Sequence, residues 1–262
     1  MKLPVPIDTA VLLAAGRGSR LSPWTDRVPK PLLVHRGRPT LDLVLDSLAL
    51  AGISRVVLVV HHLAEQFEPY AAQRTAATGQ RIVRVRQDDL FGTAHALQCV
   101  MYARPELLVT PFVLSATDYL VPSGFFGDLL RFHRSHDAPL TLSLKRLGEN
   151  GAARSSVRFA EPSAAGRHDG QDEGAVASPL GRDIVEIVEK PAPGTAPGAI
   201  GANLCFVVPP ELLGHVVETG ASVRGEREIQ TTINAWLAAG GRARGLLQPT
   251  PHEWDPQESA RF

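Results

Sequence analysis

A segment near the N-terminus combines glycines with basic residues in a pattern suited to phosphate binding. Residues 13–25 read LAAGRGSRLSPWT, and residues 29–33 read PKPLL. Gly16 and Gly18 follow small residues at the end of an apolar run, so backbone N–H groups there can approach a phosphate without obstruction by side chains. We therefore expect this segment to bind a polyphosphate.

Basic residues are concentrated in the same part of the chain. Residues 17–38 contain six Lys or Arg residues and one acid, Asp26. The six are Arg17, Arg20, Arg27, Lys30, Arg36 and Arg38. An Arg grips a phosphate through two parallel hydrogen bonds, and a Lys acts as a point charge. For any one of them a solvated loop cation is the simpler interpretation, but the whole run beside a glycine turn favours an anion site.

The glycine segment matches neither of two common nucleotide-binding motifs. The dinucleotide fingerprint requires Gly or Ala where Leu21 stands, and a P-loop requires Gly-Lys-Ser/Thr after four spacer residues. The phosphate must therefore be held in another arrangement.

The elements that position this segment follow from the first half of the chain, where short apolar runs alternate with segments of helical period. This alternation predicts an α/β fold with a mainly parallel sheet covered by helices. The expected strands are residues 10–15, 56–60, 82–86 and 112–116, and the expected helices begin at Thr40, span residues 63–78 and begin at Thr93. Thr40 and Thr93 are expected to cap their helices. Asp118 follows the fourth strand, at the edge where open α/β sheets bind ligands.

Past residue 138 the pattern changes to successive strands with little helix between them. The expected elements are strands at residues 140–147, 156–160, 184–188 and 204–208 and a helix that carries Ile229, Ile233 and Leu237. This half of the sheet is therefore expected to be mixed or antiparallel. Residues 161–182, rich in Gly and Pro among small polar residues, predict a flexible insertion between two strands of a hairpin.

The composition excludes several classes of function as first hypotheses. The 262 residues include 27 Lys+Arg and 27 Asp+Glu, so the formal net charge is zero. Sequence-independent binding to nucleic acid or to an anionic membrane needs a cationic surplus, and the apolar runs are too short to span a bilayer. Cys99 and Cys205 are expected to be reduced core residues of a cytoplasmic protein. These observations leave the oligomeric state open, a homo-oligomer included.

The glycine segment closely resembles a known signature. Residues 13–32 fill every specified position of L-A-A-G-x-G-[ST]-R-L-x-P-x-T-x-x-x-P-K-P-L, which is typical of sugar nucleotidyltransferases. This resemblance implies an enzyme that joins a nucleoside triphosphate to a sugar 1-phosphate and releases pyrophosphate. It also implies a Rossmann-like three-layer αβα fold with a mixed, mainly parallel sheet, similar to the GT-A fold.

A second stretch resembles the base-binding loop of the same family. Residues 87–96 read QDDLFGTAHA, similar to Q-x-x-x-x-G-T-A-x-A. Gln87 offers one acceptor and two donors, which fit the O4 and N3–H edge of uracil or thymine. UTP or dTTP is therefore favoured, because guanylyl members usually show Glu at this position. A helix start capped by Thr93 is the plain structural interpretation, and both can hold together.

The resemblance assigns roles residue by residue. Arg20, Lys30 and Asp118 would be catalytic, with Arg20 on the leaving pyrophosphate and Lys30 bridging the α-phosphate and the sugar phosphate. The implied nucleotide-binding residues are Leu13, Ala14, Ala15, Gly16, Gly18, Ser19, Arg20, Gln87, Gly92 and Thr93. Such chemistry requires fixed cations that stabilise spreading negative charge.

The resemblance also implies a Mg²⁺ ion as cofactor. Mg²⁺ takes one or two carboxylates together with phosphate oxygens and water, so Asp118 and Asp255 form the expected pair. Two departures from the family pattern concern this site. Thr117 replaces the usual glycine before Asp118, and Asp255 directly follows Trp254 where the family has W-x-D-x-G.

The sugar-phosphate side is marked by two further similarities. Glu189-Lys190-Pro191 matches the family's E-K-P, in which the Glu binds sugar hydroxyls and the Lys holds the sugar phosphate. Asn203 lies in a segment similar to one whose Asn contacts the sugar or ribose, and a structural Asn in a turn is about equally well supported.

We therefore expect residues 1–262 to form a single nucleotidyltransferase domain. Residues 1–138 would be the nucleotide-binding half, and residues 139–262 the sugar-phosphate-binding half. Two alternatives stay open: an enzyme of the same fold with a non-sugar acceptor such as phosphocholine, a phosphonate or a cyclitol phosphate, and a non-catalytic subunit that binds a nucleotide sugar.

Overall fold

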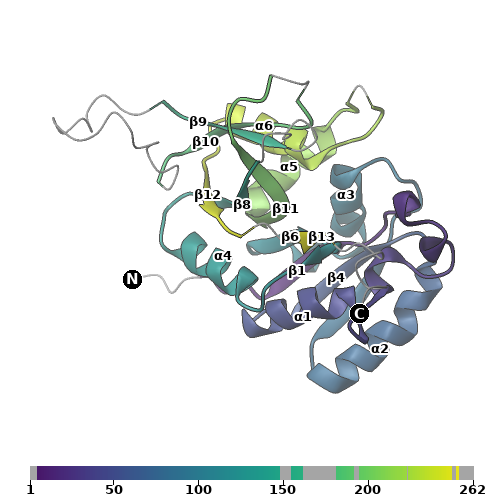
Figure 1. Ribbon diagram of the computed structural model, residues 1–262. Coiled ribbons are helices and arrows are strands. Elements are labelled where there is room, and N and C mark those ends of the chain that lie inside the picture. Colours follow the sequence, from purple (N-terminus) through teal and green to yellow (C-terminus); the bar gives the residue numbers. More distant parts are fainter. Residues whose placement is uncertain are drawn as a thin grey trace.

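One nine-stranded sheet runs through the whole molecule (Figure 1). The computed structural model describes residues 5–147, 155–161, 181–191, 195–222 and 224–249 and the backbone of 252–253. The strand order is β5-β4-β1-β6-β11-β8-β12-β10-β9. The strands are β1 (Thr9–Leu13), β4 (Arg55–Val60), β5 (Arg81–Arg86), β6 (Phe112–Ala116), β8 (Leu140–Arg146), β9 (Ser156–Phe159), β10 (Ile184–Val188), β11 (Ile200–Val208) and β12 (Ala243–Leu247).

Strand direction divides this sheet into two parts. β5, β4, β1 and β6 are mutually parallel, with Val11 opposite Val57 on one side and Leu114 on the other. β11 is antiparallel to both β6 and β8, β12 is parallel to β8, and β9 and β10 pair in antiparallel fashion. The expected change to a mixed arrangement past residue 138 is therefore confirmed.

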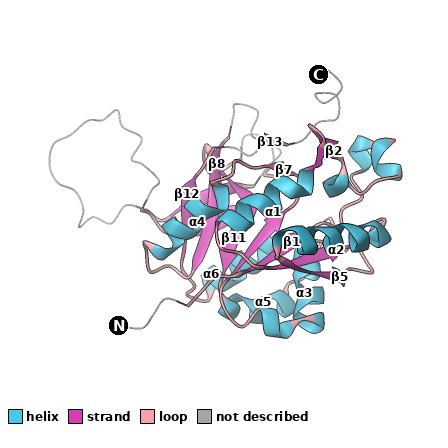
Figure 2. Cartoon of the chain, turned by 90° about the horizontal axis from the view of Figure 1, so that it is seen from below, coloured by secondary structure: helices cyan, strands magenta, loops and turns pink. Residues whose placement is uncertain are grey.

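Helices cover both faces of the sheet, so the molecule has three layers (Figure 2). On one face lie α1 (Thr40–Leu50), α2 (Phe67–Thr78) and α4 (Phe125–Arg134), and on the other lie α3 (Thr93–Ala103), α5 (Leu213–Glu218) and α6 (Ile229–Ala238). Alternation along β1 sends Ala10 and Leu12 to the first face and Val11 to the second. The expected α/β class with helices around a mixed sheet is confirmed.

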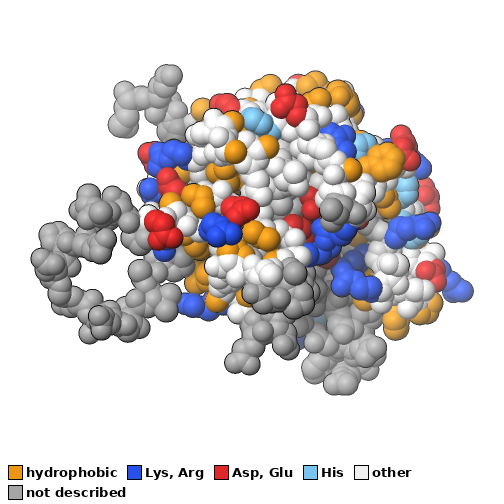
Figure 3. Space-filling model, turned by 90° about the horizontal axis from the view of Figure 1, so that it is seen from above, with side chains coloured by type: hydrophobic (Ala, Val, Ile, Leu, Met, Phe, Trp, Pro, Cys, Tyr) orange, Lys and Arg blue, Asp and Glu red, His pale blue; other side chains and the backbone are white. Residues whose placement is uncertain are grey.

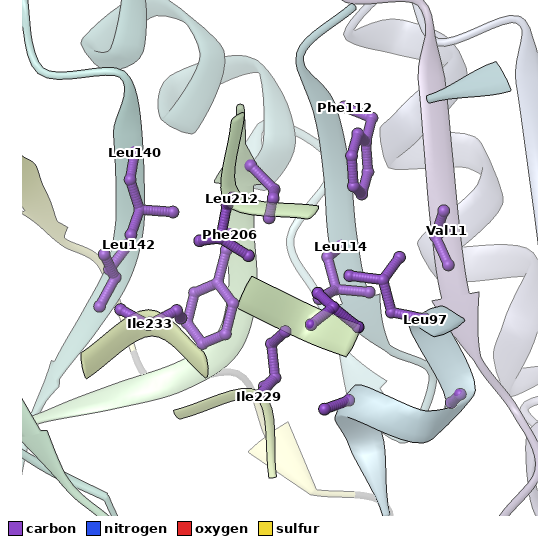
Figure 4. Close-up of a cluster of buried hydrophobic side chains, with 14 of the residues drawn as sticks. Val11, Leu97, Phe112, Leu114, Leu140, Leu142, Phe206, Leu212, Ile229 and Ile233 are labelled. Atoms are coloured by element: carbon purple, nitrogen blue, oxygen red, sulfur yellow. The ribbon is translucent and has the colours of Figure 1, made fainter. Parts of the chain in front are cut away.

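The core under α3, α5 and α6 joins the two halves of the chain. Leu97 from α3 and Ile233 from α6 pack against Leu114 of β6 and Phe206 of β11 in one buried cluster (Figure 4). Each fully buried side chain of this size contributes about 1.5–3 kcal/mol relative to its exposed state. Because β6 and β11 are neighbours, the same cluster fixes the first half of the chain against the second.

Several expected elements differ from the observed ones. β1 ends at Leu13 rather than at residue 15, which leaves Ala14 and Ala15 to the following loop. The predictions for residues 112–116 and 184–188 match β6 and β10. No element was expected at α4 or β12, although both lie in the sheet layers. The predicted insertion at residues 161–182 falls outside the described residues except at its ends.

The capping roles expected of Thr40 and Thr93 are wrong. Each is the first helical residue, and neither helix has a side-chain cap. Thr40 instead donates to Pro31 O at 3.1 Å, and Thr93 Oγ1 accepts from Ile229 N at 2.9 Å. Each threonine hydroxyl therefore forms a tertiary hydrogen bond instead of capping its own helix.

The outer surface mixes charges of both signs. On the face shown in Figure 3, Lys and Arg side chains lie interspersed with Asp and Glu side chains. Among the residues that the structure describes, no helix combines the length and apolarity needed to cross a bilayer.

Candidate active site

The glycine segment forms a loop that packs against Thr25 and Lys30. β1 ends at Leu13 at the carboxyl edge of the parallel strands, and Gly18 has a left-handed φ of 66°. Thr25 Oγ1 donates to Gly18 O at 3.0 Å. A Cβ added at Gly18 would lie 3.0 Å from Thr25 Cγ2 and 3.3 Å from Lys30 Cβ, whereas no atom lies within 4 Å of one added at Gly16. Gly18 thus sets the loop's conformation, and Gly16 keeps its outer side open.

Lys30, which packs beside Gly18 of this loop, forms an ion pair with Asp118. Lys30 begins the short 3₁₀ turn η3 (Lys30–Leu32), and Asp118 follows β6 directly. Lys30 Nζ lies 2.8 Å from Asp118 Oδ2, with the two side chains 20 % and 34 % exposed. Residues 88 positions apart are therefore brought together as a half-buried ion pair.

Thr117, which replaces the family's glycine, uses its hydroxyl in a hydrogen bond to the backbone of β1. The residue is buried, and its hydroxyl donates to Leu13 O at 3.1 Å. This bond ties the ends of β1 and β6 together beside the Lys30–Asp118 pair. The departure from the family pattern therefore contributes a cross-strand bond in this structure.

A cavity of about 380 Å³ opens between these groups. Its lining includes eleven of the residues expected from the sequence, namely Leu13, Ala14, Ala15, Gly16, Gly18, Arg20, Lys30, Gln87, Gly92, Thr93 and Asp118. Ser19 is exposed and is not part of this lining. Of the six basic residues between positions 17 and 38, Arg20 and Lys30 line the cavity, while Arg38 pairs with Asp46 of α1.

Gln87 and Gly92 also line the cavity. Gln87 is 3 % exposed, and its Nε2 donates to Gly92 O at 3.1 Å. Gly92 has a φ of 102°, and a Cβ there would lie 2.6 Å from Arg227 O. The backbone of Arg227 also donates to Phe91 O and accepts from Ala94 N. Only glycine fits at position 92 without displacing the segment around Arg227.

Two histidines stabilise the loops around this cavity. His61 Nδ1 donates to Gln87 O, and His62 Nε2 donates to Thr25 O, each at 2.7 Å. These bonds hold the backbone at Gln87 and the backbone at Thr25, which follows the glycine segment, to the end of β4.

A second cavity of about 790 Å³ adjoins the first and shares Arg20, Thr93, Leu204 and Glu226 with it. Glu189 and Lys190 line it, as expected from the E-K-P similarity. Lys190 has a positive φ of 46°, a costly conformation for a residue with a side chain. Such strain in a cavity-lining residue is typical of functional sites.

Glu189 is held by a chain of polar side chains. Ser155 Oγ donates to the Glu189 carboxylate, and Gln230 Nε2 donates to Ser155 Oγ at 3.5 Å. Ser155 and Gln230 are both buried. The carboxylate orientation is therefore set from the β9 end and from α6.

Asn203 is not brought to this cavity. It lies inside β11 rather than in a turn, it is 1 % exposed, and its Nδ2 donates to Ser143 Oγ at 3.0 Å. Its neighbours Ala202 and Leu204 face the second cavity, so alternation along the strand turns Asn203 to the opposite face.

Cavity-lining residues just before α6 and at its start were missed by sequence reasoning. Glu226, Glu228 and Gln230 line the second cavity, and Glu226 lines both cavities. Residues 224–228 read RGERE, and that dense run of charges around a glycine immediately before an apolar helix was the available signal.

One of the two expected metal ligands is described. Asp118 presents a half-buried carboxylate to the cavity, whereas Asp255 lies outside the described residues. In the described part of the chain, no group of three or more His, Cys, Asp or Glu residues could hold a metal ion by itself. Mg²⁺ needs few protein ligands when phosphate oxygens and water complete its octahedron. The donor set at Asp118 fits a metal ion that arrives with a polyphosphate.

Comparisons with known proteins agree with this geometry. Residues 10–146 match the model of the MobA-like NTP transferase domain. Over 138 residues the chain is 35 % identical to the bifunctional protein GlmU of Pelobacter propionicus, covering 53 % of this chain and 28 % of that protein. Over 143 residues it is 34 % identical to the mannose-1-phosphate guanylyltransferase of Mycobacterium tuberculosis, covering 53 % and 38 %. The chain thus spans about a third of these relatives' lengths.

Solved structures extend the likeness of the fold to the second half of the chain. A UDP-glucose pyrophosphorylase complexed with UDP-glucose superposes with a TM-score of 0.75 at 17 % identity, over 92 % of this chain and 91 % of that one. A UDP-glucose pyrophosphorylase from Acinetobacter baumannii gives 0.74 at 22 % identity, over 95 % and 88 %. The domain match spans more than half of the chain and contains the glycine loop, Lys30 and Asp118. The chain therefore belongs to the MobA-like NTP transferase domain family.

Proposed function

We propose that this protein is a Mg²⁺-dependent sugar-1-phosphate nucleotidyltransferase that uses UTP or dTTP. The observation that carries the proposal is the pair of adjoining cavities, with Lys30 and Asp118 in the first and Glu189 and Lys190 in the second. Arg20 lines both. A triphosphate and a sugar phosphate need two such adjoining sites, with cations where their anionic groups meet.

The reaction requires positioning more than covalent chemistry from the protein. A phosphate oxygen of the sugar 1-phosphate attacks the α-phosphorus in line and forms a new P–O bond. The bond from the α-phosphorus to the bridging oxygen of the β-phosphate breaks, and pyrophosphate leaves with the electron pair. Negative charge spreads over the transferring group, where fixed cations stabilise it. Lys30 acts on the α-phosphate side, and Arg20 acts on the pyrophosphate.

The Lys30–Asp118 pair prepares this site. With its ammonium 2.8 Å from Asp118 Oδ2, Lys30 is held at the cavity wall by a half-buried carboxylate. An incoming phosphate competes with that carboxylate for the ammonium. Lys30 can therefore exchange its ion pair with Asp118 for one with the substrate without a large movement of its side chain. Asp118 would hold Mg²⁺, with Asp255 as the proposed second ligand, and the ion would neutralise charge on the triphosphate.

The acceptor occupies the larger cavity. Glu189, oriented by Ser155, accepts hydrogen bonds from sugar hydroxyls, and Lys190 binds the sugar phosphate. The relatives' names include both a guanylyltransferase and UDP-sugar enzymes. Gln87 in the lining of the first cavity supports a base with an imino N–H, such as that of UTP or dTTP.

The fold supports the same proposal. The four parallel strands lie in the sheet in the order β5-β4-β1-β6. If they are numbered 1 to 4 along the chain, this order is 3-2-1-4, as in one half of a Rossmann-like sheet. We assign the chain to this Rossmann-like, GT-A-like architecture as a single nucleotidyltransferase domain.

Pyrophosphate release tests the proposal. Nucleoside triphosphates are combined with sugar 1-phosphates in a matrix, and we expect the highest turnover with UTP or dTTP. Lys30→Met should reduce kcat by about 10²–10³-fold, as loss of a donor to transition-state charge does in other enzymes. Arg27→Met, which removes an exposed cation from the same basic run, is the matched control and should leave turnover unchanged.

The outcomes separate the alternatives. Turnover with phosphocholine, a phosphonate or a cyclitol phosphate but with no sugar 1-phosphate would replace the acceptor class. Tight binding of a nucleotide sugar with no pyrophosphate release from any pair would indicate a non-catalytic subunit. Full activity of the Lys30→Met variant would refute the proposed site.

A further inference from the structure

The side-chain amide of Gln87 is held in one orientation by two acceptors. Its Nε2 lies 3.1 Å from Gly92 O and 3.1 Å from His95 Nδ1. A backbone carbonyl oxygen accepts hydrogen bonds and never donates them, so the nitrogen side of the amide must face Gly92. The second amide hydrogen then points to His95 Nδ1.

This arrangement fixes the tautomer of His95. Gln87 Nε2 has no acceptor capacity, so His95 Nδ1 must accept the bond and carry no proton. The ring proton then lies on Nε2, which is 3.8 Å from Cys99 Sγ, a weak acceptor. The His95 ring also packs against Phe91, with the ring centroids 5.3 Å apart. His95 thus lies between Gln87 and Cys99, with Nδ1 toward the amide and Nε2 toward the thiol.

Both donors of the Gln87 amide are therefore used inside the protein. The sequence predicted that Gln87 would offer an acceptor and two donors to a base, and the two donors prove to be engaged elsewhere. Oε1 is the polar atom of this side chain that remains for a ligand in the 380 Å³ cavity. An amide oxygen that faces the ring-nitrogen position of a base accepts a hydrogen bond from an imino N–H there and repels a ring nitrogen that bears a lone pair.

We propose that His95 is a positioning residue that selects bases with an imino N–H through Gln87. Uracil and thymine carry a hydrogen on N3, and guanine carries one on N1, whereas cytosine N3 and adenine N1 bear lone pairs. Gln87 then separates the first group from the second but does not separate uracil from guanine. This inference rests on the proposed nucleotide-binding function of the same cavity.

Calorimetric titration of the full chain with Mg²⁺-UTP and Mg²⁺-CTP tests the proposal. Removing one hydrogen bond that orients the amide changes an equilibrium by about tenfold or less. We expect His95→Ala to weaken UTP binding about tenfold and CTP binding little, so that discrimination falls. His95→Asn should restore discrimination, because Asn Oδ1 can accept near the position of Nδ1. At saturating UTP, kcat of both variants should match that of the unaltered protein.

Other results would overturn the inference. A purely structural role for His95 would weaken UTP and CTP binding equally, and the Asn variant would then give no selective rescue. Nitrogen-15 NMR of the histidines gives a readout that does not depend on activity, and we expect Nε2 of His95 to be protonated and Nδ1 to be free. A proton on Nδ1 would refute the arrangement. Failure of the unaltered protein to bind any triphosphate would instead refute the proposed function.

Discussion

Replacement of Gly92 by Ala is the sharpest structural test of the segment between Gln87 and Thr93. A Cβ at this position would lie 2.6 Å from Arg227 O and 2.8 Å from Arg227 N, far inside van der Waals contact. The backbone has φ 102° and ψ −177°, a region that is essentially restricted to glycine. The backbone strain costs about 1–3 kcal/mol, and the overpacking costs about 1–3 kcal/mol more. The unfolding free energy should therefore fall by about 2–6 kcal/mol.

Function should suffer together with stability. Relief of the clash requires Gly92 to move away from Arg227, which breaks the bonds from Arg227 N to Phe91 O and from Ala94 N to Arg227 O. Gly92 O would move away from Gln87 as well. The affinity for the triphosphate should then drop even at temperatures where the variant is folded.

Gly79→Ala is the matched control for this experiment. Gly79 also has a positive φ, 74°, but no atom lies within 4 Å of an added Cβ. The control should therefore lose about 1–2 kcal/mol from backbone strain alone and bind nucleotide normally. Urea denaturation followed by circular dichroism, with calorimetric nucleotide titration, measures both properties. Equal stability and equal affinity of the two variants would refute the reasoning about position 92.

Two further predictions concern buried titratable groups. Burial, followed by the neighbouring His136 and Arg134, lowers the pKa of His133 to about 4. An unfolded histidine titrates near 6.5, so the unfolding free energy should decrease as pH falls from about 6.5 to 4. The decrease should be at most about 3 kcal/mol, because solvent screens part of the interaction at this half-buried side chain. His133→Gln should flatten the decrease, and an unchanged slope would contradict the assignment. Burial also raises the pKa of the Cys205 thiol to about 12, and burial and Asp88 raise that of Cys99. Cys205 should therefore resist alkylation at pH 8 until the protein unfolds, and rapid labelling of the folded state, read by mass spectrometry, would count against this.

The sequence predicted the parallel half of the sheet well because three of its four strands, β1, β4 and β6, are buried along most of their length. Residues 56–60 are continuously apolar, and Ser115 is the one polar residue in 112–116. Such runs are distinctive when turn signals bound them. α4 escaped prediction although Phe126, Leu129 and Leu130 are buried against the sheet. Its ten residues include Gly127, which weakens a helix signal in a short segment.

The candidate site was predictable where a motif fixes the backbone and less so where strand register decides. The glycine loop and Lys30 lie within one short segment, so their proximity follows from local geometry. Asn203 shows the limit: a strand expected to begin at residue 204 in fact begins at Ile200, and that shift moves Asn203 from a turn to the strand face opposite the cavity. Glu226 reaches both cavities through tertiary packing that local pattern does not encode.

The central claim is transfer of a nucleotidyl group, and phosphorus-31 NMR of one reaction mixture tests it most directly. The protein is incubated with UTP, Mg²⁺ and the sugar 1-phosphate that gives the most pyrophosphate. We predict two new coupled resonances from a diphosphate diester, with an equimolar amount of free pyrophosphate. Formation of UMP with pyrophosphate, of UDP with orthophosphate, or no change in the UTP resonances would contradict the claim.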